Sequence, residues 1–174
     1  MGKMGKIIFI SGGVRSGKST FALELAEKCK EVVFIATAGK ITDREMNKRI
    51  LVHKESRPKH WKTIEETEDI IKHLKSFEKA DCVIVDCVTF LVSNWMFKKY
   101  TEDKIIENIK NLIKKLRKIK GKVILVSNEV GMGVVPPYKL GRDFRDIIGR
   151  VNQILAKDSN EFYFFISGIK RRLK

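Results

Sequence analysis

The chain has 174 residues, of which 43% are hydrophobic and 33% are charged. At roughly 150 residues per domain, this length predicts one domain over residues 1–174, and the apolar content excludes a disordered chain. The 36 Lys and Arg residues against 21 Asp and Glu residues give a net charge of +15. This charge favours anionic partners, which are phosphates, nucleotides, nucleic acid or an anionic membrane surface.

The three cysteines are an odd number and show no CxxC spacing. This pattern suggests neither a disulfide framework nor a zinc site, so it favours a reducing compartment. The amino end is too short and polar for a signal peptide, and every apolar run is far shorter than the about 20 residues of a membrane span. We therefore expect a cytoplasmic protein without a membrane span.

Five short apolar runs of strand length follow one another along the chain. They are rich in β-branched residues and do not alternate with polar residues, which is typical of strands buried on both faces of a parallel sheet. The predicted strands are Ile7–Ser11, Val32–Ala36, Cys82–Asp86, Val123–Ser127 and Phe162–Ile166.

The segments between these strands place apolar residues three and four apart, which predicts amphipathic helices that cover the sheet. The clearest are residues 105–119 and 140–155, and another helix is predicted over Asp43–Lys54. Strand alternating with helix, without an internal repeat or a linker, predicts one open α/β domain with a mainly parallel sheet. Ligands of such a domain bind beyond the carboxyl ends of the strands.

The strongest motif directly follows the first predicted strand. Residues 12–19 satisfy the pattern GxxxxGK[ST] and open a helix, which is the context that a phosphate-binding P-loop requires. The glycines let backbone N–H groups point at phosphate oxygens, Lys18 reaches the outer phosphates, and Ser19 supplies a hydroxyl ligand to Mg²⁺. The predicted nucleotide-binding residues of this loop are Gly12, Gly13, Val14, Arg15, Ser16, Gly17, Lys18 and Ser19.

A P-loop also needs a carboxylate at the end of a neighbouring strand to hold the metal ion. The run Val-Ile-Val-Asp that ends at Asp86 has this form, so Ser19 and Asp86 are the predicted Mg²⁺-holding residues. Asp81 and Glu129 also lie near the ends of predicted strands and stay as alternatives. A cap of the turn that follows its strand is the alternative role for Asp86.

His53 lies four residues after Arg49 on the predicted helix 43–54, so both side chains share one face. An imidazole beside a phosphate-binding loop can act as a nucleophile, as a base or as an ordinary surface histidine. Arg142 and Arg145 are three residues apart on the last predicted helix. They could face developing phosphate charge or simply lie on a solvated face.

Several further motifs accompany the P-loop in order from Ile7 to Lys174. They are Ile35–Ala38, Arg49–Ile50 with His53 and Arg57–Pro58, Trp61 with Thr63 and Glu65, Asp86–Thr89 with Asn94, Val126–Pro136, and Arg142 with Phe144–Asp146, Gly149, Asn152–Gln153 and Ser167–Gly168. In this combination the chain resembles the bifunctional adenosylcobinamide kinase / adenosylcobinamide-phosphate guanylyltransferase of cobalamin synthesis.

The resemblance implies a single-domain, RecA-like P-loop NTPase fold of the α/β class, with a mainly parallel sheet flanked by helices. It implies that ATP or GTP phosphorylates adenosylcobinamide, and that GMP then passes from GTP to the phosphorylated corrinoid to give adenosylcobinamide-GDP. His53 matches the histidine that carries GMP, Lys18 serves the phosphates, and Arg49, Glu65 and Asp86 belong to the nucleotide-binding residues. The resemblance also implies Mg²⁺ and a homo-oligomer, namely a trimer.

Two other functions compete with this hypothesis. Another P-loop kinase, acting on a small metabolite or a nucleotide, would share the loop but would form no covalent nucleotidyl adduct. A nucleic-acid-associated ATPase or binding module is suggested by the basic pI of about 9.8. Such a module needs aromatic side chains on a basic surface, whereas most aromatic residues here occupy apolar strand or helix positions, so we expect no nucleic acid partner.

Overall fold

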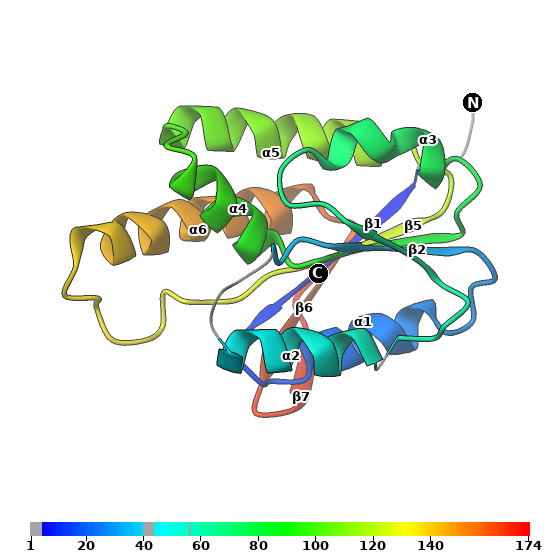
Figure 1. Cartoon of the computed structure of the whole chain (residues 1–174), viewed down its shortest axis with the longest axis horizontal. Coiled ribbons are helices and arrows are strands. Elements are labelled where there is room, and N and C mark those ends of the chain that lie inside the picture. The colour runs from blue at the N-terminus through cyan, green and yellow to red at the C-terminus, as the bar shows by residue number, and fades with distance from the viewer. Residues whose placement is uncertain (1–4, 40–43, 56) are drawn as a thin grey trace.

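The computed structural model describes residues 5–39, 44–55 and 57–174, and these build one seven-stranded sheet with helices on both faces (Figure 1). The strand order is β3-β2-β4-β5-β1-β6-β7, and every neighbouring pair is parallel except β6 with β7. The strands are β1 (Lys6–Gly12), β2 (Val32–Ala36), β3 (Lys62–Glu65), β4 (Cys82–Asp86), β5 (Lys122–Val126), β6 (Glu161–Ile166) and β7 (Ile169–Arg172).

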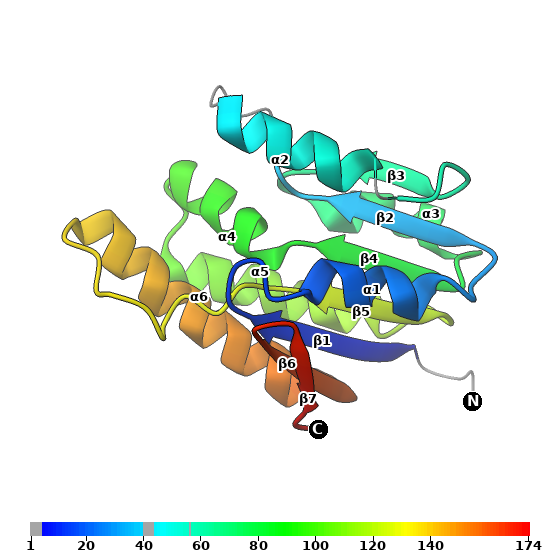
Figure 2. The ribbon, with the colours of Figure 1, turned by 90° about the horizontal axis from the view of Figure 1, so that it is seen from below.

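The helices lie in two layers. Figure 2 shows α1 and α2 over one side of the sheet and α4, α5 and α6 over the other. They are α1 (Lys18–Ala26), α2 (Arg44–Glu55), the short helices η1 (Ile70–His73) and α3 (Leu74–Phe77), α4 (Val88–Phe97), α5 (Glu102–Leu116) and α6 (Lys139–Asp158). None of the helices in the described ranges is long and apolar enough to cross a membrane.

All five predicted strands are present, and their burial explains their composition. Consecutive residues of β1 point to opposite faces, so that Phe9 packs in the core under α5 and α6 while Ile8 and Ile10 pack in the core under α1. Both faces of β1, β2, β4 and β5 are covered by helices, which is why these four strands consist of continuous apolar residues, whereas β6 is only partly buried. The mainly parallel α/β sheet flanked by helices is thus confirmed.

The helix boundaries shift slightly from those predicted. The helix predicted over 105–119 begins at Glu102 and ends at Leu116, where Thr101 accepts a hydrogen bond from the Lys104 N–H at 3.3 Å and caps the amino end. The helix predicted over 43–54 runs over Arg44–Glu55. Residue Asp43, its predicted start, lies outside the described residues.

One buried carboxylate fixes the chain where β3 ends. The backbone N–H groups of Glu68 and Asp69 donate to Glu66 Oε1 at 2.8 and 2.9 Å. The Lys72 ammonium and His73 Nε2 lie 2.5 and 2.9 Å from Glu66 Oε2. Burial raises the pKa of Glu66, but these hydrogen bonds outweigh it and lower the pKa to about 2.

Glu66→Gln should therefore lower the free energy of unfolding at pH 7 by about 2 kcal/mol. Because the folded-state pKa lies below that of the unfolded chain, the stabilisation is complete above about pH 5 and is lost as the pH falls toward 2. Urea unfolding between pH 7 and 3 should show the difference between wild type and variant shrinking. The same change at the exposed Glu78 is the control, and a difference that does not change with pH would contradict this account.

Candidate functional site

The loop between β1 and α1 has the backbone that a phosphate cradle needs. Gly12 has a backbone φ of 148° and Gly17 one of 100°. Residues that carry a Cβ rarely adopt these values. A Cβ at Gly12 would also lie 2.3 Å from the carbonyl oxygen of Phe165 on β6. The two glycines therefore allow the loop to curl tightly between the sheet and the helix.

Lys18 lies inside this loop and is almost fully buried. Its Nζ donates to the carbonyl oxygen of Gly13 at 2.5 Å and lies 3.5 Å from Ser16 Oγ, which itself donates to Gly13 at 2.8 Å. Burial lowers the pKa of Lys18, and the nearby Asp86 carboxylate opposes this shift. The lysine is thus held where a bound phosphate would supply the charge that compensates for its burial.

The amino end of α1 points into the same loop. Gly17 is its N-cap residue, and no side chain there accepts a hydrogen bond from the first turn. The free N–H groups and the helix dipole make such an end an anion site. Val14 and Arg15 lie exposed at the outside of the loop, and Ser19 lies in the first turn of the helix. The predicted P-loop residues are therefore brought together.

Asp86 ends β4 at the same edge of the sheet, as predicted, but β4 is not the neighbour of β1 that was expected, because β5 lies between the two strands. Thr37, which follows β2, accepts a hydrogen bond from the N–H of Cys87 at 2.8 Å and donates to the carbonyl oxygen of Cys87 at 2.6 Å. This buried pair of bonds fixes the turn after Asp86. Asp81 lies at the opposite end of β4, where its carboxylate accepts hydrogen bonds from two backbone N–H groups, so it is not near the loop.

Glu129, the other alternative to Asp86, is engaged in its own loop. Its Oε1 accepts a hydrogen bond from the N–H of Gly131 at 2.7 Å, and its N–H donates to the carbonyl oxygen of Gly12 at 2.9 Å. Arg145 donates to the carbonyl oxygen of Gly131 at 2.8 Å, and Arg142 donates to that of Pro137 at 2.7 Å. Both arginines thus brace the loop after β5.

Arg57 is a site residue to which the sequence interpretation gave no role. Its guanidinium carbon lies 3.8 Å from the centroid of the Phe34 ring, and its buried Nε has no hydrogen-bond partner among the described residues. Burial lowers the pKa of Arg57, and the carboxylates of Asp86 and Glu65 oppose this shift. A guanidinium at this place can contact a phosphate. In the sequence, Arg57 was marked by its position directly before a proline and by the Arg57–Pro58 motif that accompanies the P-loop.

The remaining predicted residues lie on the side of the P-loop where β2 and β3 end. Glu65 ends β3 in register with Ala36, which is itself in register with Asp86, and Lys54 lies 3.1 Å from Glu65 Oε1. The backbones of Arg49 and His53 belong to α2, and their side chains lie outside the described part of the structure. Their predicted roles therefore stay predictions.

The chemistry of the donor set fits magnesium. A serine hydroxyl at Ser19 and a carboxylate at Asp86 are hard oxygen ligands, which Mg²⁺ prefers. Within the described ranges no three His, Cys, Asp or Glu side chains gather into a metal cluster. Mg²⁺ is usually bound through one or two protein groups together with phosphates and waters, and the two residues here correspond to that mode.

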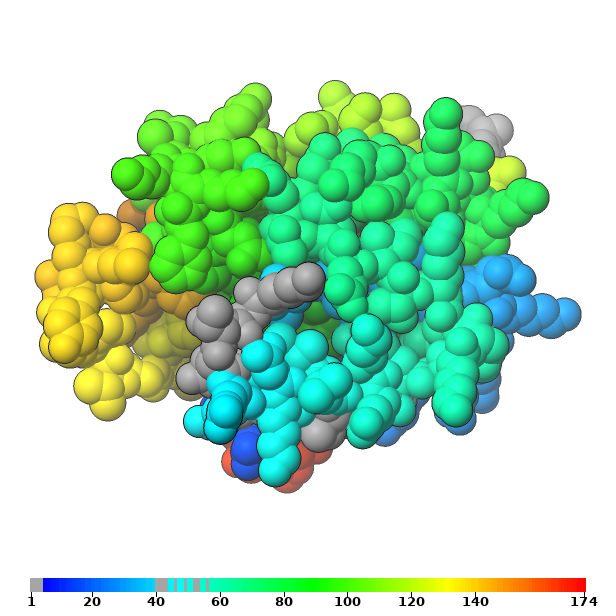
Figure 3. Space-filling view, viewed as in Figure 1, coloured from blue at the N-terminus to red at the C-terminus, as the bar shows by residue number. Residues whose placement is uncertain are grey.

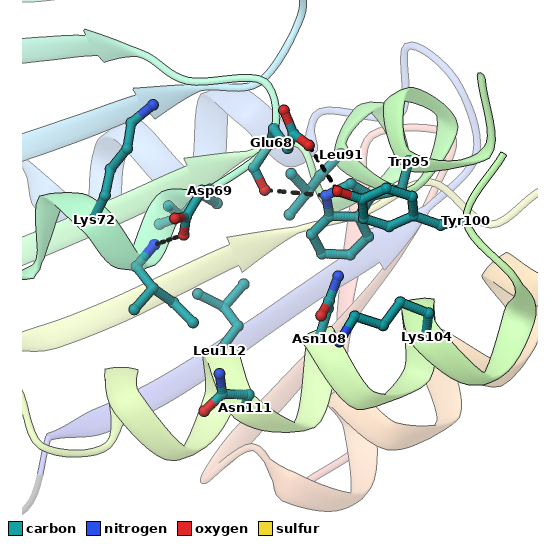
Figure 4. Close-up of a pocket in the computed structure, with 12 residues that line it drawn as sticks. Glu68, Asp69, Lys72, Leu91, Trp95, Tyr100, Lys104, Asn108, Asn111 and Leu112 are labelled. Atoms are coloured by element: carbon teal, nitrogen blue, oxygen red, sulfur yellow. Dashed lines mark hydrogen bonds between the residues drawn. The ribbon is translucent and has the colours of Figure 1, made fainter. Parts of the chain in front are cut away.

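A cavity of about 480 Å³ lies elsewhere, between η1, α4 and α5 (Figure 4). Its aromatic groups are bound within the protein, since Trp95 donates to the carbonyl oxygen of Glu68 at 3.0 Å and Tyr100 donates to Glu68 Oε1 at 2.8 Å. Hydrogen bonds from Lys98 and Tyr100 lower the pKa of Glu68. Among the residues that the structure describes, none of the predicted site residues lines this cavity.

A glycine-rich loop, a buried lysine and a strand-end carboxylate on a mainly parallel sheet define a P-loop nucleotide-binding domain of the α/β class. Residues 8–173 match the family described as cobinamide kinase / cobinamide phosphate guanyltransferase. The chain belongs to this enzyme family.

Three relatives and one solved structure illustrate this similarity. The bifunctional adenosylcobalamin biosynthesis proteins CobU of Escherichia coli K12 and Salmonella typhimurium LT2 are 40% and 39% identical over 97% of this chain and 99% of their own length. CobP of Pseudomonas aeruginosa PAO1 is 38% identical over 95% of each chain. A KaiC-like protein of Pyrococcus horikoshii OT3 shares the fold, with a TM-score of 0.52 at 16% identity over 92% of this chain and 71% of its own.

Proposed function

We propose that the chain catalyses two successive transfers on one corrinoid substrate. In the first, the hydroxyl of adenosylcobinamide takes the γ-phosphoryl group of ATP or GTP, and the nucleoside diphosphate and a proton leave. In the second, GTP transfers GMP through a guanylyl-histidine to the new phosphate, and adenosylcobinamide-GDP forms. The family match and the kinase and guanyltransferase names of that family support this assignment.

The phosphoryl transfer relies on positive charge that the folded P-loop already holds beside the phosphates. The N–H groups at the amino end of α1 and the Lys18 ammonium face the phosphate oxygens, and they stabilise the charge that spreads over them in the transition state. Ser19 and Asp86 would hold Mg²⁺, which neutralises phosphate charge when it is bound. The short loop fixed by Thr37 keeps Asp86 in place.

The guanylyl transfer needs a nucleophile, and we assign this role to His53. Its neutral imidazole attacks the α-phosphorus of GTP, a phosphorus–nitrogen bond forms, and pyrophosphate leaves. The phosphate oxygen of the corrinoid then attacks the same phosphorus, and the imidazole is restored. The position of α2 supports this role. The helix lies between β2 and β3 in the chain, and Arg57, two residues beyond its end, lies close enough to Asp86 for the charge of this carboxylate to affect it.

The observation that carries the proposal is the buried Lys18 within the P-loop, with the Asp86 carboxylate near it, in a chain from this family. Its test is a two-stage incubation followed by mass spectrometry. Adenosylcobinamide with ATP and Mg²⁺ should gain one phosphate, and addition of GTP should then convert the product to adenosylcobinamide-GDP. A phosphorylated product that GTP leaves unchanged would favour a P-loop kinase without guanylyltransferase activity.

Asp86→Asn should lower the activity of both stages by about 100-fold and shift the Mg²⁺ requirement to higher concentration, because a metal-binding carboxylate is lost. Rates measured across a Mg²⁺ titration test this. Asp81→Asn, at the other end of the same strand, is the matched control and should behave like wild type. An unchanged titration for Asp86→Asn would move the metal role to another residue.

We also propose that the enzyme is a homo-oligomer, a trimer by resemblance. Apolar side chains of the loop after β5 support this, since Met132 and Val134 are 79% and 94% exposed. Figure 3 shows this segment, coloured yellow to orange, projecting at one end of the molecule. Exposed apolar side chains in one segment are typical of an interaction surface.

A further inference from the structure

We propose that the turn between β6 and β7, together with Val14 of the P-loop, forms a platform for the purine base of the nucleotide that donates the phosphoryl group. The platform consists of Ile166, Ser167, Gly168, Ile169 and Val14. This proposal rests on the proposed function. It adds that the guanine of the guanylyl transfer is held elsewhere, on the opposite side of the P-loop.

The direction of a bound triphosphate follows from the sheet order. β1 lies between β5 and β6, and Asp86 on β4 lies beyond β5. Asp86, the proposed metal-holding carboxylate, ends β4, so the phosphate that is transferred lies on the β4 side of the loop. The α-phosphate and the nucleoside then extend toward the other neighbour of β1, which is β6. The carboxyl end of β6 is the turn that carries Ser167 and Gly168.

This turn is fastened to the P-loop. The N–H of Gly168 donates to the carbonyl oxygen of Ser16 at 3.2 Å. A Cβ at Gly17 would lie 3.6 Å from the buried Phe165 ring and 3.9 Å from Gly168 Cα. Figure 2 shows the turn, in red, next to the blue loop that precedes α1. A group that leaves the P-loop on this side therefore meets the turn first.

The side chains of the turn suit the face of a purine base. Ile166 and Ile169 are directly opposed in the β6–β7 pairing, so they share one face of the hairpin, and they are 60% and 74% exposed. Val14 is 75% exposed at the outside of the P-loop. Ser167 at φ 49° and Gly168 at φ 85° make the tight turn that brings the two isoleucines together. Aliphatic side chains of this kind cover planar bases without selecting one purine over another.

The other side of the loop carries the residues assigned to guanylyl transfer. α2, with the backbone of His53, runs beside β2 and β3 at one end of the strand order. The strands β4, β5 and β1 lie between β2 and the β6–β7 hairpin, so α2 and the turn lie at opposite ends of the sheet (Figure 2). A guanylyl group on His53 would carry its base on that side. The two reactions thus share the phosphate-binding loop and use different base sites.

The test compares two anions that differ in the nucleoside. Calorimetry with Mg²⁺ measures the binding of ATP and of inorganic tripolyphosphate to wild type and to the double variant Ile166→Ser, Ile169→Ser. We expect the dissociation constant of ATP to rise about tenfold, since apolar cover is lost, while that of tripolyphosphate changes by less than about twofold. Leu173→Ser, an equally exposed residue beyond the far end of β7, is the matched control and should bind both anions like wild type.

The rate of guanylylation is the second measurement of the test. The double variant should form the adduct with α-labelled GTP at the wild-type rate, because the guanine of that reaction lies beside α2. Equal weakening of ATP and tripolyphosphate, unchanged ATP binding, or loss of the adduct would each overturn the platform. Failure of the wild type to form an adduct would reject the guanylyltransferase, while the comparison of ATP with tripolyphosphate would still decide about the platform.

Discussion

Lys18→Ala abolishes both reactions in this account, with rates at least about 1000-fold below wild type, because one ammonium serves the phosphates in both. It should also weaken the binding of ATP and of tripolyphosphate alike. The fold should survive, since the variant removes a buried charge whose pKa is already lowered by burial. Steady-state rates for each stage, with calorimetry for binding, measure these effects.

The control for this prediction is Lys28→Ala, an exposed lysine just beyond the carboxyl end of α1. It removes the same charge from the same part of the chain, so it reports the effect of net charge alone, and both activities should stay at the wild-type level. If Lys18→Ala kept either activity near the wild-type rate, the two reactions could not share the P-loop.

The sequence predicted those strands whose burial requires a continuous run of apolar residues. β1, β2, β4 and β5 are covered on both faces and read as apolar runs, whereas β3 and β7 lie at the edges of the sheet. β7 is exposed along its whole length and three of its four residues are basic, so no apolar pattern marked it. The sequence also did not predict α4. Apolar residues occupy most positions of this helix, so its sequence shows no amphipathic periodicity.

The candidate site divides in a similar way. The P-loop and Asp86 could be predicted because local geometry requires particular residues at fixed spacing. Arg57 could not, since its importance depends on the Phe34 ring and the Asp86 carboxylate, which the fold brings to it from two strands. The same holds for Thr37, whose hydroxyl serves the turn after Asp86 across about 50 residues of chain.

His53→Ala should separate the two chemistries. Guanylyl transfer should fall below detection, because no group remains to carry GMP, while the phosphoryl transfer should stay within about fivefold of wild type, since a kinase passes its phosphoryl group directly to the hydroxyl. Separate assays of the two stages measure this. His60→Ala, an exposed histidine outside the helices, is the matched control and should leave both stages unchanged.

The guanylyl-histidine itself is the central claim, and labelling tests it most directly. Protein incubated with Mg²⁺ and GTP labelled at the α-phosphate, then denatured and digested, should carry the label on the peptide that contains His53. The label should survive alkali and be released by acid, as a phosphorus–nitrogen bond to imidazole requires, and GTP labelled at the γ-phosphate should leave none. Label on a peptide with His60 or His73, or label that acid does not release, would contradict the account.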